Sequence, residues 1–282
     1  MKNTDFWIRD PFVLLDGGKY YIYGTTRPRE KHGFDLYVSD DLVNFEGPFE
    51  VFDLFDGFWG KMHYWAPEVH KYQGKYYMFA TFKDDGSWHG CQILRADSPM
   101  GPFVPHSAGP ITPKEWSSLD GTFYVDKNGT PYMIFCHEWI QTRNGEMCYA
   151  QLSDDLTHFV TEPKLMFRAG DFPEIIKPCR ESDEFVTDGP FMYRNSKGDL
   201  FMIWSSIGEL GYLECLMKSS NGEIDGDFAP VSLLFKEDGG HGMLFRDKEN
   251  RLMFSLHRPN RVNEHLELFE LTEDEDGNLV RK

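Results

Sequence analysis

The stretch TDGPFMYRNSKGDLFMIWSS, residues 187–206, decides the fold because the chain repeats its pattern. It consists of a short apolar run, a turn rich in Gly, Asn and Asp, and a second run of aliphatic and aromatic residues, which is typical of a β-hairpin. Four other stretches align with it: RDPFVLLDGGKYYIYGTT (9–26), WAPEVHKYQGKYYMFATF (65–82), LDGTFYVDKNGTPYMIFCH (119–137) and GHGMLFRDKENRLMFSLH (240–257). Repetition of this kind indicates an architecture built from equivalent units.

A further strand-like stretch follows each hairpin: FDLYVSDDLVNFE, CQILRADSPMGPF, MCYAQLSDDLTHF, LECLMKSSNGEIDGDF and LELFELTEDEDGN. The SDDL pattern within them is a turn into a fourth, outer strand. Four antiparallel strands repeated five times predict an all-β fold, a five-bladed β-propeller. We expect residues 1–282 to form this one domain.

Charge limits the class of partner. The 282 residues include 29 Lys and Arg against 46 Asp and Glu, a formal net charge of −17. Nucleic acid and anionic membranes favour clustered Lys and Arg, so we expect neither as a partner, whereas a carbohydrate is compatible. There is no apolar run of membrane length and no signal peptide. We therefore expect a cytoplasmic protein if the chain is complete, a periplasmic or secreted one if a signal peptide has been removed, and no particular oligomeric state.

Three aspartates hold equivalent places in the repeats. In a propeller the first strand of every blade lines the axis, so the residues that open these strands converge. In the aligned repeats they are Asp10, Ala66, Asp120, Asp188 and His241. A single Asp before Pro or Gly is ordinarily a turn residue that accepts backbone N–H groups. Three carboxylates crowded in one channel raise at least one pKa and are costly to fold, so the set predicts a functional site.

Such a set suits the cleavage of a glycosidic bond. One carboxyl group must donate a proton to the leaving oxygen, and another must be ionised to activate water or attack the sugar. A third can raise the pKa of the acid and orient it. The two reacting groups lie about 6.5–9.5 Å apart in inverting enzymes and about 5–5.5 Å apart in retaining ones.

The loops between second and third strands should open on the same face. We expect these loop residues to contact a sugar: Trp88, His137, Glu138, Trp139, His257 and Arg258. Tryptophan rings stack on sugar faces, although packing is an equal alternative for about half of them and a structural role is equally open for His137 and Glu138. The long segment from Glu162 to Val186 is expected to close part of the pocket.

With these residues the chain resembles glycoside hydrolase family 43, the five-bladed propellers that act on arabinofuranosides and xylosides. The resemblance covers essentially the whole chain. It rests on RDP (9–11), WAPEVHKYQGKYYMF (65–79) and LDGTFYVDKNGTPYM (119–133), which occur in this order.

The resemblance implies a role for each axial acid. Asp10 would be the general base that activates water, and Asp120 would tune and orient the acid. Asp188 stands where the family has its general acid, which implies an inverting reaction. Trp65 would form part of the sugar-binding wall.

One departure from the family concerns the acid. The family normally has a glutamate in an EGP-like context, whereas TDGP supplies the shorter Asp188. A backbone shift or a different substrate pose can compensate. Alternatively Glu138 or Glu184 delivers the proton, or the hydrolase is impaired and the pocket only binds sugar.

His241, in GGHGM, matches the family's axial histidine, which in many members lies near a hydrated calcium ion or a water molecule. Calcium prefers oxygen ligands, so any Ca²⁺ near His241 would be bound through water, and a buried histidine is more often simply hydrogen-bonded. We expect no required cofactor. The five cysteines form no CxxC pair, so we also expect free thiols and no zinc site.

These features predict a glycosidase that removes terminal α-L-arabinofuranosyl units from plant-type oligo- and polysaccharides with inversion. A β-xylosidase or galactofuranosidase of the same fold, an endo-acting arabinanase and a sugar-binding propeller without activity are the alternatives. The NDPNG-like opening of β-fructosidases is absent, and so are the repeat signatures of kelch and WD interaction propellers.

Overall fold

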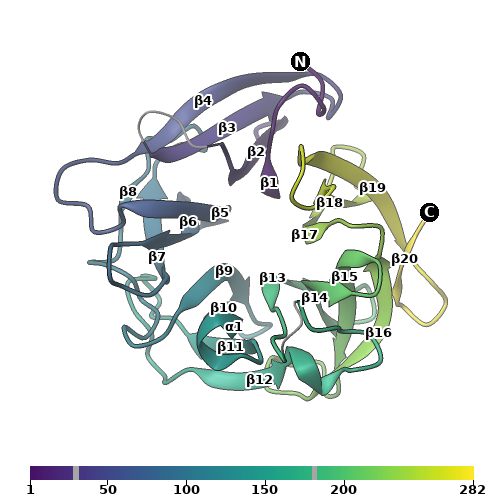
Figure 1. Cartoon of the computed structure of the whole chain (residues 1–282). Coiled ribbons are helices and arrows are strands. Elements are labelled where there is room, and N and C mark those ends of the chain that lie inside the picture. The colour runs from purple at the N-terminus through teal and green to yellow at the C-terminus, as the bar shows by residue number, and fades with distance from the viewer. Residues whose placement is uncertain (28–31, 180–182) are drawn as a thin grey trace.

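The chain folds into a ring of five blades around a central axis (Figure 1). The structure, a computed structural model, describes residues 1–27, 32–179 and 183–282. Each blade is a sheet of four antiparallel strands, which run from the axis outward in chain order. The predicted all-β fold, a five-bladed β-propeller with four strands per blade, is confirmed. The helices in the described residues are single turns, α1 (Trp139–Thr142) and the 3₁₀ turn η1 (Ala169–Asp171).

Every blade comes from one continuous stretch of chain. The first blade consists of β1 (Arg9–Asp16), β2 (Lys19–Thr25), β3 (Gly33–Ser39) and β4 (Phe45–Asp53). The second consists of β5 (Met62–Tyr72), β6 (Lys75–Lys83), β7 (Gly90–Ala96) and β8 (Val104–Pro105). The third consists of β9 (Ser118–Val125), β10 (Pro131–His137), β11 (Glu146–Gln151) and β12 (Lys164–Arg168). The fourth consists of β13 (Asp188–Arg194), β14 (Leu200–Gly208), β15 (Gly211–Ser219) and β16 (Phe228–Phe235). The fifth consists of β17 (Gly240–Arg246), β18 (Leu252–Arg258), β19 (His265–Glu273) and β20 (Leu279–Arg281).

The blades pack face to face, so their middle strands are covered on both sides. This explains why β6 contains YYMFATF, a run of aromatic and aliphatic residues interrupted by Thr81, rather than an alternating pattern. Aromatic rings fill the space between the first two blades. Phe34, Phe58 and Tyr64 each lie within 6 Å of Phe82, measured between ring centroids.

Every inner strand carries a β-bulge near its start, where the pairing with the second strand slips. At one equivalent bulge position every blade has a residue with a left-handed backbone: Asp10 (φ 53°), Ala66 (44°), Asp120 (56°), Gly189 (49°) and His241 (51°). A proline or glycine follows in each case. This conformation is strained for residues other than glycine and costs on the order of 1–3 kcal/mol each, so the surrounding structure must enforce it.

Hydrogen bonds between blades hold these bulges. In four of them the bulge amide donates to a side chain on the second strand of the preceding blade: Ala66 N to Thr25 Oγ1 (2.8 Å), Asp120 N to Thr81 Oγ1 (3.0 Å), His241 N to Ser205 Oγ (2.6 Å) and Asp10 N to His257 Nδ1 (3.2 Å). The corresponding residue of the third blade is Cys136, and Gly189 N donates instead to Asp120 Oδ2 (3.1 Å). Five hydrogen bonds thus form a closed ring around the axis.

Glu264, just before β19, joins the last blade to the first. Its carboxylate accepts a hydrogen bond from Trp7 Nε1 (2.7 Å) and pairs with Arg9 Nη1 (3.3 Å), and its carbonyl accepts the amide of Ile8 (3.2 Å). Glu264 is buried. The residues just before β1 are therefore held in place by the fifth blade, which is the last in the sequence.

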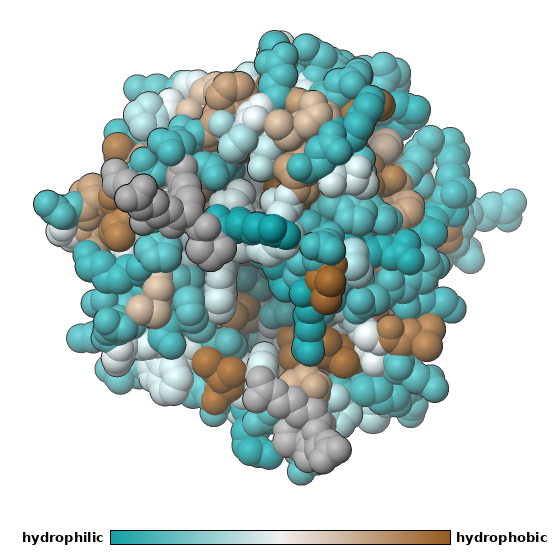
Figure 2. All heavy atoms as spheres, turned by 45° about the horizontal axis from the view of Figure 1, so that its top comes forward, coloured by the Kyte–Doolittle hydropathy of each residue, from teal (hydrophilic) through white to brown (hydrophobic). Residues whose placement is uncertain are grey.

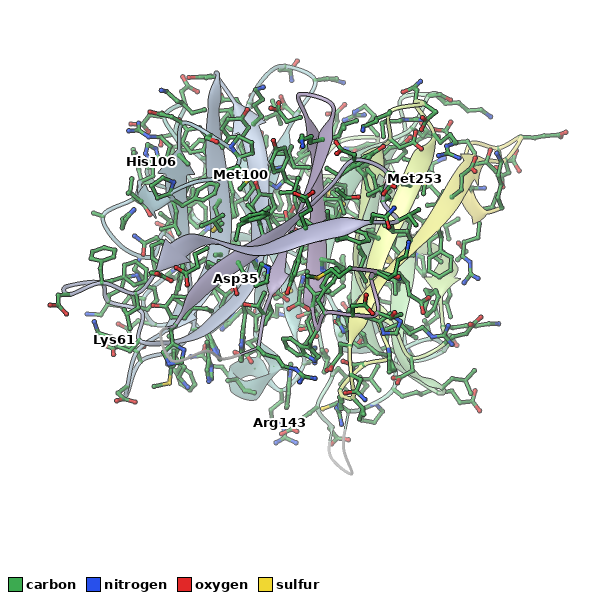
Figure 3. All side chains as sticks on the ribbon, turned by 90° about the horizontal axis from the view of Figure 1, so that it is seen from above. Asp35, Lys61, Met100, His106, Arg143 and Met253 are labelled. Atoms are coloured by element: carbon green, nitrogen blue, oxygen red, sulfur yellow. The ribbon has the colours of Figure 1, made fainter. Side chains whose placement is uncertain are left out.

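The two faces of the ring differ. In the edge-on view of Figure 3, Lys61 and Arg143 lie toward one face, and Met100 and His106 lie toward the other. Lys61 precedes β5 and Arg143 ends α1, so the first of these faces is the one on which the inner strands begin. The five cysteines are free, as expected. In the part of the chain that the structure describes, no helix is long and apolar enough to cross a membrane.

We predict that Glu264→Ala lowers the free energy of unfolding by about 1–3 kcal/mol, because the half-buried Trp7 and Arg9 donors lose the buried carboxylate that accepts from them. Urea denaturation measures the change. Glu249→Ala is the matched control, since Glu249 also pairs with an arginine, Arg251, but is exposed; its urea midpoint should stay close to that of the parent protein. Equal effects of the two substitutions would contradict this account of ring closure.

Candidate active site

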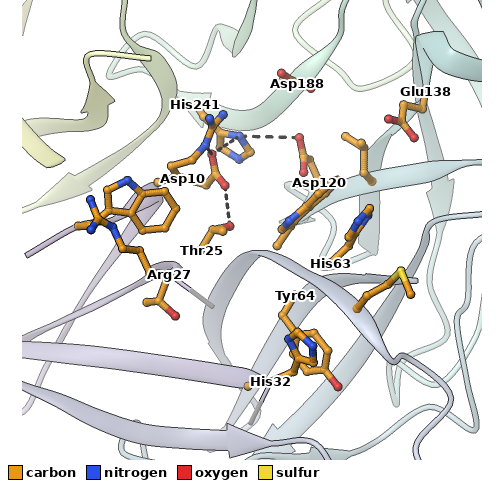
Figure 4. A pocket seen from close by; sticks show the side chains of 17 residues that line it. Asp10, Thr25, Arg27, His32, His63, Tyr64, Asp120, Glu138, Asp188 and His241 are labelled. Carbon is orange, nitrogen blue, oxygen red and sulfur yellow. Dashed lines mark hydrogen bonds and ion pairs between the residues drawn. The ribbon is translucent and has the colours of Figure 1, made fainter. Parts of the chain in front are cut away.

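A pocket of about 500 Å³ opens on the face where the inner strands begin. Figure 2 shows this face as largely hydrophilic and hollowed near its middle. Residues of all five blades line the pocket, most of them from the first two (Figure 4). Its volume lies in the range of sites for small ligands. Six residues expected at a site line it: Asp10, Trp65, Asp120, Glu138, Asp188 and His241.

The bulges arrange these residues in two rows. Asp10, Asp120 and His241 are bulge residues and lie close together on the axis. In four of the five blades the residue immediately before the bulge residue also lines the pocket, and these form a second row: Arg9, Trp65, Leu119 and Asp188. The expectation that Asp188 occupies the same position as Asp10 is therefore wrong by one residue. Gly189 occupies that position, because Gly189, followed by Pro190, takes the left-handed conformation.

Asp10 is held as a carboxylate. Its Oδ2 accepts a hydrogen bond from Thr25 Oγ1 (2.7 Å), and its Oδ1 lies 3.1 Å from His241 Nδ1 and 3.9 Å from Arg9 Nε. Burial opposes ionisation, but the charges of His241 and Arg9 outweigh it and lower the pKa of Asp10 to about 2. Asp10 is consequently ionised in any solution near neutrality.

The pKa of Asp120, unlike that of Asp10, is raised. Its Oδ2 accepts the Gly189 amide at 3.1 Å and lies 3.7 Å from His241 Nδ1. Burial is the main cause that raises the pKa of Asp120 well above the usual value, and the nearby carboxyls of Asp188 and Asp10 add to it, while His241 opposes it. Asp120 therefore keeps its proton more readily than an exposed aspartate.

Asp188 also has a raised pKa. Burial raises the pKa of Asp188 to about 6, although His241 and a hydrogen bond from Tyr212 oppose the shift. The Tyr212 hydroxyl donates to Asp188 Oδ2 at 3.0 Å, and the Tyr212 ring stacks on His257 with centroids 5.6 Å apart. The pKa of Asp10 is thus lowered and that of Asp188 is raised, which is the difference expected between a general base and a general acid.

Two other carboxylates were candidates for the acid. Glu138 lines the pocket, but its Oε2 already accepts Ser117 Oγ (2.6 Å) and His89 Nδ1 (2.8 Å). Glu184 does not line it. In the segment from Glu162 to Val186, β12 belongs to the third blade, residues 180–182 lie outside the described residues, and none of the others lines the pocket.

His241 serves the axis as a cation. Burial disfavours its charge, but Asp10, Asp120 and Asp188 outweigh burial and raise the pKa of His241 to about 9. A protonated imidazole repels metal ions, and the described residues contain no group of three or more His, Cys, Asp or Glu side chains arranged to hold one. These residues do not fit a metal ion bound directly by protein, and we derive no step through one.

Five residues expected at the mouth do not line this pocket: Trp88, His137, Trp139, His257 and Arg258. His137 stacks on Trp116 at 4.2 Å and bonds to Glu146 (2.9 Å). Arg258 lies near Glu237 (3.5 Å) and Glu267 (3.7 Å).

The other three residues, His257, Trp88 and Trp139, lie elsewhere in the structure. His257 is fully buried behind Asp10, and burial lowers its pKa to about 4, so it is neutral. Trp88 is 42% exposed but lies outside the lining, and Trp139 begins α1.

Sequence reasoning missed part of the pocket wall, notably Trp7, Arg9, Thr25 and His63. Arg9 stands directly before Asp10 in RDP, and the opposite charges of these neighbours could have indicated that Arg9 also belongs to the site. His63 stands two residues before Trp65, which places both side chains on the same side of a strand. Trp7 and Thr25 carry no comparable signal, because their positions follow from ring closure and from the bulge.

Comparisons with known proteins agree with this geometry. The family model described as glycosyl hydrolases family 43 matches residues 5–278. The chain is 28% identical over 155 residues to xylosidase/arabinosidase 43A of Humicola insolens, which covers 48% of this chain and 45% of that protein. It is 24% identical over 251 residues to a xylosidase/arabinosidase of Bacteroides ovatus, covering 73% of this chain and 75% of that one.

A solved structure is similar over its full length. The endo-arabinase from Bacteroides thetaiotaomicron VPI-5482 superposes with a TM-score of 0.91 at 36% identity, covering 98% of each chain. A thermostable family-43 glycoside hydrolase has a TM-score of 0.83 at 22% identity, with 98% of this chain and 92% of that chain covered, which supports the fold alone.

We predict that Tyr212→Phe raises the pKa of Asp188 by about one pH unit, because the lost hydrogen bond stabilises the ionised form. Carbon-13 NMR titration of the carboxyl resonances measures the change. Tyr193→Phe is the control, since the Tyr193 hydroxyl also bonds to a carboxylate, Glu273 (3.2 Å), but outside the pocket. An Asp188 pKa that stays fixed or falls in Tyr212→Phe would refute the assignment of this contact.

Proposed function

Because the chain belongs to glycoside hydrolase family 43, whose model spans residues 5–278, we propose that it hydrolyses terminal α-L-arabinofuranosyl linkages in plant-type oligo- and polysaccharides. The observation that carries the proposal is the single pocket in which Asp10 and Asp188 lie with opposite shifts of pKa. The names of the related proteins, xylosidase/arabinosidase and endo-arabinase, support a pentosyl substrate.

In the proposed reaction Asp10 is the general base. Its lowered pKa keeps it ionised, and its contacts with Thr25 and His241 fix its orientation. It takes a proton from a water molecule as the water oxygen bonds to the anomeric carbon. The attack from the face opposite the leaving group inverts the configuration.

Asp188 is the proposed general acid. Its raised pKa leaves it protonated in mildly acidic solution, and it gives this proton to the glycosidic oxygen as the bond to the anomeric carbon breaks. The Tyr212 hydroxyl orients the shorter side chain. Glu138 fits the role less well because its Oε2 already accepts two hydrogen bonds.

Asp120 and His241 are proposed to position the reacting pair. His241 lies between Asp10 and Asp120, at 3.1 and 3.7 Å, so its charge stabilises the base (Figure 4). Asp120 binds the Gly189 amide and so fixes the backbone next to Asp188. The scheme uses no cofactor, and any calcium ion near the axis would have a structural role through water.

An endo-acting arabinanase is the second candidate, because the full-length similarity is to a protein named endo-arabinase. The pocket is lined by residues of five blades and suits a terminal sugar. A groove for an internal unit would continue past it on both sides.

A substrate panel tests the proposal. We expect 4-nitrophenyl α-L-arabinofuranoside to be hydrolysed faster than the β-D-xyloside and the β-D-galactofuranoside, and arabinose to be the first product from arabinan. The Asp10→Asn variant, prepared in parallel, should reduce turnover by a factor of 10² or more because the base is lost. Release of arabinan oligomers before arabinose would favour the endo-acting candidate, and no turnover of any glycoside would leave only a sugar-binding propeller.

We predict that Asp188→Ala reduces kcat/KM far more for arabinobiose, whose leaving group needs a proton, than for the activated nitrophenyl glycoside, by roughly 10²-fold or more. In the parent protein kcat/KM should fall as the pH rises through about 6, since Asp188 then loses its proton. This basic limb should vanish in Asp188→Ala. Glu138→Ala is the matched control, and the same leaving-group pattern in that variant would move the acid to Glu138.

A further inference from the structure

A second chain of ionisable groups borders the pocket away from the three aspartates. Glu138, at the start of α1, accepts hydrogen bonds on Oε2 from His89 (Nδ1, 2.8 Å) and Ser117 (Oγ, 2.6 Å). His89 Nε2 in turn lies 2.7 Å from His63 Nδ1. The catalytic scheme above uses none of these contacts.

The chain of contacts is rigid. His89 is 4% exposed and Glu138 is 6% exposed. His63 has a left-handed backbone (φ 55°), and its ring stacks on that of Trp65 with centroids 4.2 Å apart and planes inclined by 12°. A non-glycine residue keeps this conformation only when its surroundings enforce it, and strained residues cluster at functional sites.

The hydrogen bonds also have a direction. A carboxylate only accepts, so the Nδ1 of His89 must carry the hydrogen that Glu138 receives. In neutral His89 the Nε2 then has a lone pair, and it accepts the hydrogen on His63 Nδ1. His63 is left with a lone pair on Nε2, for which the described residues offer no partner.

This lone pair is on the pocket side of the ring. His63 lines the pocket beside Trp65, in the wall opposite the ion pairs of Asp10 (Figure 4). Because Nδ1 faces the buried His89, Nε2 at the far side of the ring faces away from the protein interior. Desolvation and the neighbouring His89 lower the pKa of His63, which keeps the ring neutral.

We propose that His63 Nε2 is a hydrogen-bond acceptor for one hydroxyl of the sugar, and that Glu138 and His89 fix it in this form. The inference rests on the proposed function, since it names which feature of the substrate the pocket selects. A site built to bond a hydroxyl rejects an analogue that lacks it, because its own polar group is then buried without a partner. His63 is thus a specificity-determining residue.

The tautomer of His63 tests the chain without any substrate. Nitrogen-15 NMR at pH 8 should show the hydrogen on Nδ1 of His63, and Glu138→Leu should lose this preference because the acceptor that sets the direction is gone. Addition of L-arabinose or D-xylose should shift the Nε2 resonance. A hydrogen on Nε2 in the parent protein would overturn the proposal even if the enzyme is an arabinofuranosidase.

Two variants separate the acceptor from the packing. In His63→Asn the amide occupies the place of Nδ1, keeps the contact with His89 and ends short of the pocket, and asparagine tolerates the left-handed backbone. In His63→Gln the amide reaches the place of Nε2. We expect kcat/KM on 4-nitrophenyl α-L-arabinofuranoside to fall about 10- to 100-fold in His63→Asn and much less in His63→Gln.

Deoxy analogues complete the test. On the 2-deoxy, 3-deoxy or 5-deoxy arabinofuranoside that lacks the recognised hydroxyl, parent and His63→Asn should be equally slow. If His63→Asn and His63→Gln lose the same factor in kcat/KM on the arabinofuranoside and on every deoxy analogue, His63 has a structural role only. Turnover of the xyloside alone would contradict the proposed arabinosyl specificity and leave the His63 inference to be decided by the NMR result.

Discussion

The ring of hydrogen bonds between blades is the constraint on which the site depends. Each bulge amide donates to the preceding blade, through Thr25, Thr81, Ser205 or His257 in four cases and through Asp120 in the fifth. The same bulge that turns an amide toward the neighbouring blade turns its side chain toward the axis. Asp120 is part of both sets because Cys136, a weak acceptor, stands where the other blades have a hydroxyl or, at His257, an imidazole. The bulges that connect the blades are therefore the same ones that place the acids on the axis.

The axis tolerates so many buried ionisable groups because Asp10 is paired with cations and burial raises the pKa of the other acids. Asp10 is an anion beside the cations Arg9 and His241. Burial raises the pKa of Glu214 to about 8, and its Oε2 accepts hydrogen bonds from Ser205 Oγ (2.7 Å) and the Gly242 amide (3.0 Å). Buried charges are expensive unless paired or neutralised. Both solutions occur here: Asp10 is paired, and burial favours the protonated form of Asp120, Asp188 and Glu214.

The repeats made the fold predictable, because five hairpins with the same apolar and turn pattern admit few other arrangements. Asp10, Asp120 and His241 were also found from sequence, since the aligned repeats place each of them at the same position in its inner strand. Asp188 was aligned one residue off, because Asp in TDGP was matched to Asp in RDP although the glycine holds the bulge. His137 and Arg258 looked suited to sugar, yet Trp116, Glu237 and Glu267 engage them. Hydrophilic loop residues show no sequence difference between facing a pocket and facing each other.

The continuity of each blade along the chain also sets an order of assembly. No strand of the first blade is supplied by the end of the chain, so four blades are complete before the fifth emerges from the ribosome. Asp10 meets His241 and His257, and Arg9 meets Glu264, only when that last blade docks. Until then the Asp10 carboxylate has Arg9 and Thr25 but lacks His241 and His257, which are half of the side chains that lower its pKa. A chain that lacks the fifth blade therefore carries every acid of the pocket lining without the two histidines that lie against Asp10.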